Sequence, residues 1–521
     1  MPSSVIEAEV HQQLRTYLRQ QGIPHWPHHL TLARLVARAL RLGRSALIQT
    51  GSASMCHGRY RLSYLMSVLL WPGPVILVLP DIIQQHLMWV DLPRLRQWIP
   101  TYKPIQVGDT WPGDSFTGLL ITTPEAWLAD RLGPQTRFPT QIPTLIDGID
   151  DLEGWVQQQL TTSLKTPAWD ALMLAYPDQH QLIWDIRVQL THSVFQYPTN
   201  PYQCHLLEDR ERTLLATLYS ELVVESPQPA SSQAAMPPAW QQFWQQFWTA
   251  HPLLWVSFNR SQGQFCLHCG PTTVAPILAP IWSQQPLVLI GAAFDLEIQA
   301  PNYRQRLGLP TELTCLKFSL DRHSEAIRLY VPDHLPMPNT RQFQTALLQE
   351  IRQLLTHDTR QGVTIILVSD IPLKGQLGSI LASEFGSRVQ VDRTCLDDNG
   401  ILVTDWQFWQ HYQTVLPTPH LLIIPTLPIP SLEAPLVAGR VAYYKSQRQD
   451  WFRCYLLPMA LSTLQRAVAP IRDTQGIVAL LDNRVNYRSY GRQVLEALSP
   501  AARTTYLETE WLRDSNCSLP G

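Results

Sequence analysis

The chain has 521 residues, of which 45% are hydrophobic, and a formal net charge of −2. This length and this hydrophobic content predict two to four domains with large buried cores, which excludes a disordered chain. No apolar run reaches the roughly 18 residues of a membrane-spanning helix, and the polar N-terminal sequence does not resemble a signal peptide. Eight cysteines without tight spacing fit a reducing compartment. We therefore expect a cytoplasmic protein without a membrane partner.

The first part of the chain alternates between helix-like and strand-like segments. Apolar residues at helical spacing predict helices at 5–21, 30–42 and 61–70. Buried strands are predicted at four short apolar runs, namely Ser45–Gln49, Val75–Leu79, Gly118–Ile121 and Thr144–Ile146. This order of strand, helix and strand implies a parallel sheet with helices on both faces.

The segment 151–250 is predicted to be helical and is rich in Gln and Trp. It contains the linker Ser226–Pro238, so it forms an insertion or a separate lobe. Trp240, Trp244 and Trp248 follow each other at a spacing of four residues. A stacking surface for unpaired bases has this spacing, but a helix face packed on a core requires it and is the favoured interpretation.

Strand-like runs resume at Leu253–Phe258 and Leu287–Ile290, before a second α/β series. The strands of that series are predicted at Val363–Ser369, Val389–Val391, Gly400–Thr404, Leu421–Ile424 and Gly476–Leu481. The fold class is therefore α/β, with two parallel-sheet domains of the nucleotide-binding type and a helical insertion in the first. We assign 1–150 with 251–300 to the first domain, 151–250 to the insertion, 301–500 to the second domain and 501–521 to a tail.

The segment Phe408–Leu498 resembles the second motor domain of DinG/XPD-type superfamily 2 DNA helicases. Family motifs that read approximately FWEGVD, LPF, LPxA, QGxGRxIR and GVVxLLDxR find counterparts at matching spacing. In the first domain, ITTPEAWLADRL and LIDGIDDLEGW look like the family's TTP motif and its metal-binding motif. The resemblance covers nearly the whole chain. It implies two RecA-like domains of the P-loop NTPase type, single-stranded DNA rather than RNA as partner, and ATP with Mg²⁺ as cofactors if any nucleotide binds.

The phosphate-binding loop of this family needs a lysine for the β- and γ-phosphates and a Ser or Thr hydroxyl for Mg²⁺. Here the loop reads GSASMCHGRYR from Gly51 to Arg61. One register places Arg59 at the lysine position and Tyr60 at the hydroxyl position, and another register is shifted by at least one residue. Neither register supplies a lysine. The residues that the resemblance assigns to nucleotide binding are Gly51, Ser52, Gly58 and Arg59.

The resemblance assigns Mg²⁺ to Asp147, but the next residue is Gly148, where the family has the glutamate that activates water. Asp150, Gln465 and Arg472 match catalytic positions, whereas Ala469 replaces the arginine that would stabilise the transferring phosphate. Further departures are His411, Tyr412 and Gln413 in the GVD motif and Gly291 and Ala293 in the TSAT-like motif. Losing such an arginine alone typically costs several orders of magnitude in rate. We expect ATP hydrolysis to be absent or very slow.

Many relatives insert an iron–sulfur domain between the phosphate loop and the metal-binding motif. The residues from Gly58 to Asp147 contain no cysteine, so we expect no Fe–S cluster. Cys266 and Cys269 form a lone CxxC pair in a strand-like run. Without a second pair, buried strand cysteines are favoured over a metal or redox site.

The segment Leu436–Gln493 contains nine Arg or Lys residues and three Asp residues. This positive charge could follow a phosphate backbone, line an emptied nucleotide cleft or form a solvated face. Three functions remain open: a nucleic-acid-binding protein without productive use of ATP, an atypical active helicase, and a scaffold whose cleft binds a protein partner or holds a nucleotide as a structural element. A role in DNA repair rests on fold analogy alone.

Overall fold

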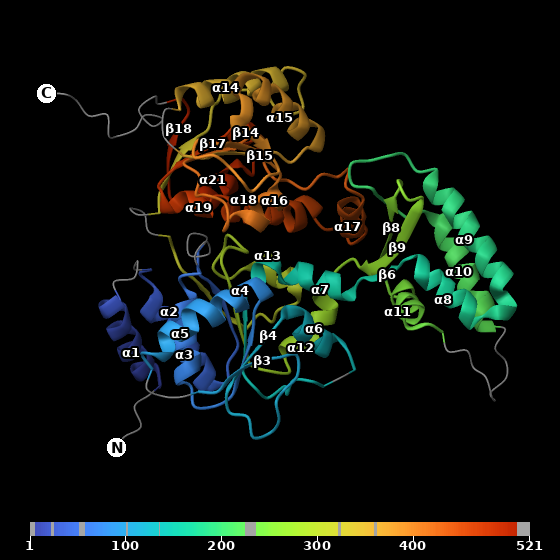
Figure 1. Cartoon of the computed structure of the whole chain (residues 1–521), viewed down its shortest axis with the longest axis horizontal. Coiled ribbons are helices and arrows are strands. Elements are labelled where there is room, and N and C mark those ends of the chain that lie inside the picture. Colours follow the sequence, from blue (N-terminus) through green and yellow to red (C-terminus); the bar gives the residue numbers. More distant parts are fainter. Residues whose placement is uncertain are drawn as a thin grey trace. The chain divides into compact units, whose positions relative to one another are not determined.

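The computed structural model of the chain describes residues 6–21, 26–51, 58–99, 103–134, 136–224, 236–320, 325–358 and 362–507. Two compact units make up the chain (Figure 1). Unit 1 comprises Met1–Leu152, Ile277–Ile429 and Leu457–Gly521, and unit 2 comprises Glu153–Pro276 and Pro430–Leu456. None of the helices in the described part of the chain is long and apolar enough to cross a membrane.

Unit 1 contains two parallel sheets, and the first has the strand order β11-β1-β10-β5-β2-β4-β3. Its described strands are β1 (Ala46–Gln49), β2 (Val75–Val78), β3 (Ile105–Val107), β4 (Leu119–Thr122), β5 (Thr144–Asp147), β10 (Leu287–Gly291) and β11 (Thr314–Lys317). All neighbouring strands run parallel. The five inner strands are buried along their whole length. This explains their uninterrupted apolar sequence, because a parallel sheet is covered on both faces.

Helices cover this first sheet. They are α1 (Ile6–Gln21), α2 (His29–Leu42), α3 (Arg61–Leu70), α4 (Asp81–His86), η2 (Leu87–Asp91), α5 (Leu92–Arg96), α6 (Pro124–Leu132), η3 (Ile149–Asp151), α12 (Ala275–Trp282) and α13 (Pro301–Leu307). Helices α1, α2 and α3 share a core with Ile48, Leu77 and Ile121. Since side chains alternate along a strand, these residues mark one face of the sheet.

The second sheet of unit 1 has the order β14-β15-β13-β16-β17-β12-β18, again with parallel neighbours. Its strands are β12 (Ile327–Tyr330), β13 (Thr364–Leu367), β14 (Val389–Val391), β15 (Ile401–Thr404), β16 (Leu421–Ile424), β17 (Ile477–Leu480) and β18 (Ala501–Thr504). Its helices are α14 (Phe343–His357), α15 (Ile371–Phe385), η5 (Gly386–Arg388), α16 (Trp406–Tyr412), α18 (Leu457–Ala467), α19 (Ala469–Asp473), α20 (Arg484–Tyr487) and α21 (Gly491–Leu498). Helices α14 and α15 pack on one face in a shared core.

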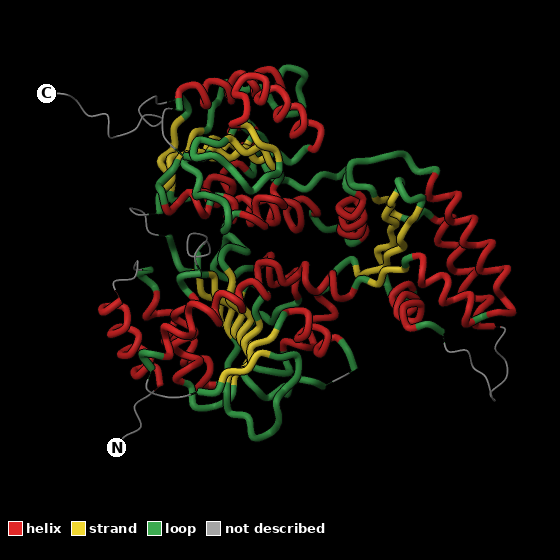
Figure 2. Tube along the Cα trace, viewed as in Figure 1, coloured by secondary structure: helices red, strands yellow, loops and turns green. Residues whose placement is uncertain are grey.

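Unit 2 is built around an antiparallel sheet with the order β6-β9-β8-β7 (Figure 2). Its strands are β6 (Thr162–Leu164), β7 (Cys204–Leu206), β8 (Pro252–Asn259) and β9 (Gln264–Pro271). Its helices are α7 (Leu152–Leu160), α8 (Thr166–Ala175), η4 (Pro177–Gln179), α9 (His180–Phe195), α10 (Asp209–Val224), α11 (Pro238–Phe247), α17 (Pro435–Ser446) and η6 (Phe452–Leu456). Helices α8 to α11 share a core with one face of the sheet, and α17 contacts β7 and β8.

The structure corrects the predicted place of Leu253–Phe258. This run lies in β8 and pairs with β7 and β9 in unit 2, not with the first parallel sheet. Strands β8 and β9 form a hairpin across a short turn, and one face of their sheet carries polar side chains. Such a strand has an apolar pattern on one side only, unlike the strands of a doubly covered parallel sheet.

Two edge strands also differ from their predicted places. Strand β11 lies in 301–500 but pairs with β1 of the first sheet. Strand β18 lies in the predicted tail but pairs with β12 of the second sheet. Both strands are partly exposed, so their apolar signal is weak in the sequence. The segment Pro430–Leu456 was predicted for the second domain and groups with unit 2.

The tryptophan stripe packs as a core face over two of its three positions. Trp240 and Trp244 are buried on α11, whereas Trp248 is 54% exposed. The helix ends at Phe247, so the spacing of four residues no longer directs the next side chain to the core.

The lone CxxC pair lies on strand β9. Cys269 packs in the core of unit 2, where burial raises its pKa to about 12. Residues three positions apart point to opposite faces of a strand, so Cys266 faces the other way. The two thiols therefore do not converge on one metal ion.

His268 lies on the face of β9 opposite the core of unit 2. Its two ring nitrogens form hydrogen bonds with the hydroxyls of Ser163 and Ser257, both at 2.8 Å. The ring stacks on Trp255 at a centroid distance of 5.0 Å. Burial, with a smaller contribution from the charge of Lys165, lowers the pKa of His268 from 6.5 to about 4. The imidazole of His268 is therefore neutral in folded unit 2 at neutral pH.

This lowered pKa predicts that unit 2 loses stability in acid. The contribution is fully present above pH 6.5, where the unfolded histidine is also neutral, and is lost as the pH falls towards 4. We expect a loss of about 1–2 kcal/mol between pH 7.5 and pH 5, since His268 is partly exposed. Thermal unfolding at the two pH values measures it. The His268→Gln variant, which cannot titrate here, should lose less; an equal loss in both proteins would contradict this role.

Candidate functional site

Three inner strands of the first sheet end close together. Strands β1, β10 and β5 are neighbours, and each carries a predicted motif at its carboxyl end. Gly51 follows β1, Gly291 ends β10 and Asp147 ends β5. In open parallel sheets, ligands bind at this edge. We therefore take this edge as the candidate site.

Asp147 is fully buried and accepts hydrogen bonds from three side chains. The Tyr60 hydroxyl donates to Oδ1 at 2.5 Å. Arg61 Nε and the Tyr64 hydroxyl donate to Oδ2, both at 2.9 Å. Arg61 and Tyr64 belong to the start of α3, and Tyr60 directly precedes that helix. The first turn of α3 is thus fixed to the end of β5.

This cluster balances its own charge. Burial alone would lower the pKa of Arg61, but its interactions with Tyr60 and Asp147 outweigh that effect, and the net shift is upward. Burial, followed by the charge of Asp147, raises the pKa of Tyr60 and Tyr64. These upward shifts keep Arg61 charged and both phenols neutral at neutral pH. A buried ion pair with this many hydrogen bonds satisfies both charges.

A magnesium ion does not fit beside Asp147 in this arrangement. Both carboxylate oxygens are already hydrogen-bonded, and the nearest cation is the Arg61 guanidinium. Mg²⁺ demands near-octahedral oxygen ligands and keeps several waters, whereas this carboxylate has no exposed surface. An ion could bind only after Arg61 and the tyrosines moved away.

Gly148 and Asp150, which belong to the same motif as Asp147, have structural roles. Gly148 adopts a left-handed backbone conformation with φ of +82°, which a glutamate would adopt only with strain. Asp150 accepts hydrogen bonds from the backbone N–H groups of Ala292 and Ala293, at 2.7 and 2.8 Å. Burial raises the pKa of Asp150. A Cβ on Gly291 would lie 2.7 Å from Asp150 Oδ2, so this contact requires the glycine.

Arg472 is buried, and its guanidinium binds main-chain carbonyls. It donates to the main-chain carbonyls of Glu325, Leu498, Ser499 and Pro500, at 2.7 to 3.3 Å. Burial lowers its pKa to about 10. The side chain has no exposed surface, so its role here is to hold the chain before β12 and before β18.

The residues assigned to nucleotide binding lie as follows. Gly51 donates its N–H to the Ala292 carbonyl at 3.0 Å, with φ of +90°. Gly58 has φ of +57°, and Arg59 pairs with Asp473 at 3.5 Å. Ser52 lies outside the described residues. Arg59 is thus directed to a carboxylate of the second domain rather than to the end of β5.

Gln465 and Gly51 line a cavity of about 320 Å³ within unit 1. Lys317 also lines it, but its Nζ donates to the carbonyls of Asp295 and Leu296 at 3.0 and 2.5 Å. Burial lowers the pKa of this lysine. Lys317 is therefore committed to the main chain and does not replace the missing lysine of the phosphate loop.

Side chains of α18 join the second sheet domain to the first inside unit 1. Arg466 pairs with both oxygens of Asp151, at 2.6 and 3.1 Å. The Ser462 hydroxyl donates to the Ala293 carbonyl at 2.7 Å. The partner of Arg466 therefore lies four residues beyond Asp147, in the same motif.

Sequence analysis did not assign Arg61, Tyr64, Asp151 or Arg466 to the site. A usable signal was present only for the tyrosines. Tyr60 and Tyr64 are four residues apart at the start of a predicted helix, which places them on one side. Asp147, at the end of the third predicted strand after that helix, was their available partner.

Comparison with known proteins identifies the fold and the proteins that the chain resembles. No protein-family model matches the chain. It resembles the solved structure of S. tokodaii Xpd4, with a TM-score of 0.57 and 11% identity over 92% of this chain and 99% of that one. A solved XPD helicase gives a TM-score of 0.59 at 11% identity, over 92% of this chain and 100% of that one. The fold is that of a two-domain RecA-like helicase, with an insertion.

Sequence similarity points to DNA helicases within this class of fold. The chain is 27% identical over 258 residues to the ATP-dependent DNA helicase YoaA of Haemophilus influenzae. The aligned segment covers 46% of this chain. It is 25% identical over 255 residues to YoaA of Escherichia coli. Together with the fold, these similarities support a relationship to the DinG/XPD-type superfamily 2 helicases. The match covers 40% of the length of either relative.

The buried cluster predicts that Asp147→Ala destabilises the protein. Removing the carboxylate leaves Arg61 buried without its charge partner, which typically costs about 3–5 kcal/mol. An aspartate that served only as a magnesium ligand would not affect the metal-free protein in this way. Denaturant unfolding without metal or nucleotide measures the difference. Asp114→Ala, at an exposed loop position, is the matched control. Equal stability of the two variants would show that the cluster does not support the fold.

Proposed function

We propose that this protein binds single-stranded DNA through its helicase fold and does not hydrolyse ATP productively. The observation that carries the proposal is the cluster of Tyr60, Arg61 and Tyr64 on Asp147. The two proteins that are similar to part of its sequence are named ATP-dependent DNA helicases. That similarity suggests a nucleic-acid-binding helicase, and the site indicates which part of the activity is altered.

Phosphoryl transfer depends almost entirely on positioning and on stabilising charge around the phosphate. Asp147 forms an ion pair with Arg61, which takes the place of a metal ion beside the carboxylate. Gly148 has no side chain to orient water, and Ala469 stands where the family's arginine is expected. Arg472, the other arginine of that motif, is buried in main-chain contacts. These features support a loss of productive ATP use. ATP and Mg²⁺ would bind only to a rearranged cleft.

A basic and aromatic segment of unit 2 supports the nucleic-acid part of the proposal. Between Pro435 and Leu456 the basic residues are Arg440, Lys445, Arg448 and Arg453, against one acidic residue, Asp450. Lys445 is exposed and lies 5.4 Å from the Trp451 ring, which is partly exposed. Exposed cations for phosphates beside aromatic rings for bases are the combination that binds single strands.

Two alternatives stay in view. The first is an atypical but active ATP-dependent DNA helicase, in which the cluster opens during the cycle. The second is a scaffold for a protein partner.

The proposal also places the protein in the cytoplasm, with DNA preferred over RNA.

A titration with labelled oligonucleotides tests the proposal. Fluorescence anisotropy should show binding to a 20-nucleotide DNA strand at low salt, with affinity falling steeply as salt rises because counterions are released. Adding Mg-ATP should leave the affinity unchanged, and phosphate release should not exceed a protein-free blank. Lys445→Glu with Arg448→Glu should weaken binding at least about tenfold and reduce the salt dependence. The matched control is Arg15→Glu with Arg19→Glu on α1, which changes the charge equally.

The other outcomes separate the alternatives. Strand-stimulated ATP turnover would establish an active helicase and remove the proposal. Failure of both DNA and RNA strands to bind at low salt would favour the scaffold.

A further inference from the structure

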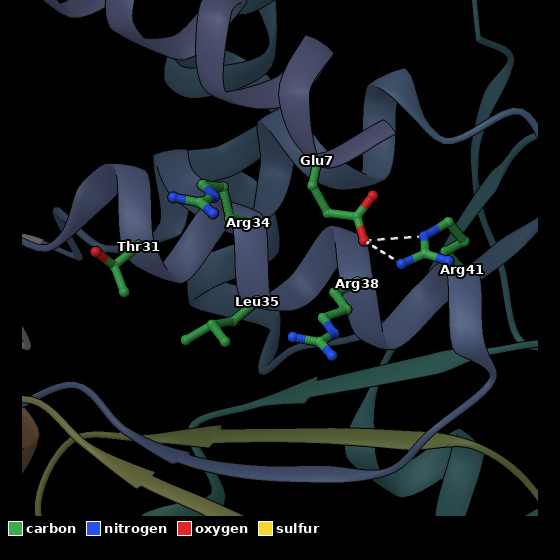
Figure 3. A pocket seen from close by; sticks show the side chains of 6 residues that line it. All are labelled: Glu7, Thr31, Arg34, Leu35, Arg38 and Arg41. Carbon is green, nitrogen blue, oxygen red and sulfur yellow. Dashed lines mark hydrogen bonds and ion pairs between the residues drawn. The ribbon is translucent and has the colours of Figure 1, made fainter. Parts of the chain in front are cut away.

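A second charged site lies between the two N-terminal helices, and none of its lining residues belongs to the cluster on Asp147. A pocket of about 400 Å³ is lined by Glu7 of α1 and by residues of α2 (Figure 3). The contributing residues of α2 are Thr31, Arg34, Leu35, Arg38 and Arg41. This volume is in the range of small-molecule sites. Neither the helicase resemblance nor the proposed function makes use of this pocket.

The three arginines lie on one side of α2. Arg34 and Arg38 are four residues apart and Arg41 follows after three, so they are neighbours on the helix surface. Arg34 and Arg38 are separated by about 6 Å along the helix axis. Like charges this close destabilise a helix slightly, so the arrangement favours a bound anion.

One of these charges is already balanced within the pocket. Arg41 donates to Glu7 Oε1 through Nε at 2.9 Å and through Nη2 at 2.7 Å, as Figure 3 shows. This hydrogen bond lowers the pKa of Glu7, so the carboxylate is charged. Glu7 is the acidic residue among the described lining residues. Its charge leaves the pocket with an excess of positive charge, in a chain whose net charge is −2.

Arg34 and Arg38 supply that excess. Both are exposed, and within the described residues neither forms an ion pair. Each guanidinium presents a fork of N–H donors that matches the oxygens of a phosphate group. The Thr31 hydroxyl, at the end of the pocket away from Glu7, adds another donor (Figure 3).

The lining also limits the kind of ligand. The described lining residues include no aromatic side chain, so the pocket offers no surface on which a base could stack. Recognition would rest on phosphate groups alone. We propose that this pocket binds a ligand with two or more neighbouring phosphate groups, held by Arg34 and Arg38. The source is either a free polyphosphate chain or the backbone of a nucleic acid.

Two ligands and two variants test this site in the full-length protein. Sodium tripolyphosphate is titrated by calorimetry and a 20-nucleotide single-stranded DNA by anisotropy, both at low salt. The pocket variant is Arg34→Glu with Arg38→Glu. The control is Arg15→Glu with Arg19→Glu, which makes the same charge change at exposed positions of α1 outside the pocket. Thermal melting of each variant confirms that it folds.

We expect the pocket variant to bind at least one ligand about tenfold more weakly or worse, because two charge-assisted contacts are lost. The control should stay within about twofold of the wild-type protein. Weakening of tripolyphosphate binding alone identifies a free polyphosphate as the source. Weakening of strand binding, with a smaller salt dependence, identifies a nucleic acid backbone.

The proposal is overturned if the wild-type protein binds neither ligand, or if the pocket variant and the control bind alike. Its failure is distinguishable from failure of the proposed function. Tripolyphosphate binding without any strand binding would keep the pocket and remove DNA binding. Equal strand binding by the pocket variant and the control, with no tripolyphosphate bound, would remove the pocket proposal and keep DNA binding.

Discussion

The contact between Asp147 and Arg61 determines the architecture around the candidate site. A carboxylate without exposed surface at the end of a strand costs several kcal/mol unless a cation and hydrogen-bond donors compensate it. In a P-loop enzyme a metal ion on the nucleotide can supply that compensation. Here the start of α3 supplies it, through Arg61, Tyr60 and Tyr64. The charge balance that a nucleotide-binding enzyme obtains from its ligand is thus part of the fold.

The other departures from the helicase motifs are consistent with this arrangement. Gly148 occupies a left-handed backbone position, and Gly291 leaves room for the Asp150 carboxylate, which binds the chain beyond β10. Asp151 pairs with Arg466 of the second domain. Gly148 and Gly291, which appear in the sequence as separate departures from the motifs, therefore each have a structural reason.

The sequence predicted the parts of the fold whose physical signal is local. Inner strands such as β5 and β16 are covered on both faces, so each appears as an uninterrupted apolar run. Strands β11 and β18 lie at sheet edges and are partly exposed, and the antiparallel sheet of unit 2 alternates polar and apolar residues. Asp147 could be placed because it ends an apolar run. Arg61 could not, because its role depends on a partner 86 positions away in the chain.

Arginines show most clearly why residue type alone does not identify a binding site. Arg472 matches a catalytic motif, yet main-chain carbonyls take up its donors, and Arg61 is neutralised by a buried carboxylate. Arg34 and Arg38 match no motif, but they are exposed, lie one turn apart and line a pocket in which Glu7 is committed to Arg41. An arginine is available to an anionic ligand only when the fold leaves its charge unbalanced. That condition depends on contacts distant in sequence, which explains why motif matching assigned Arg472 and overlooked Arg34.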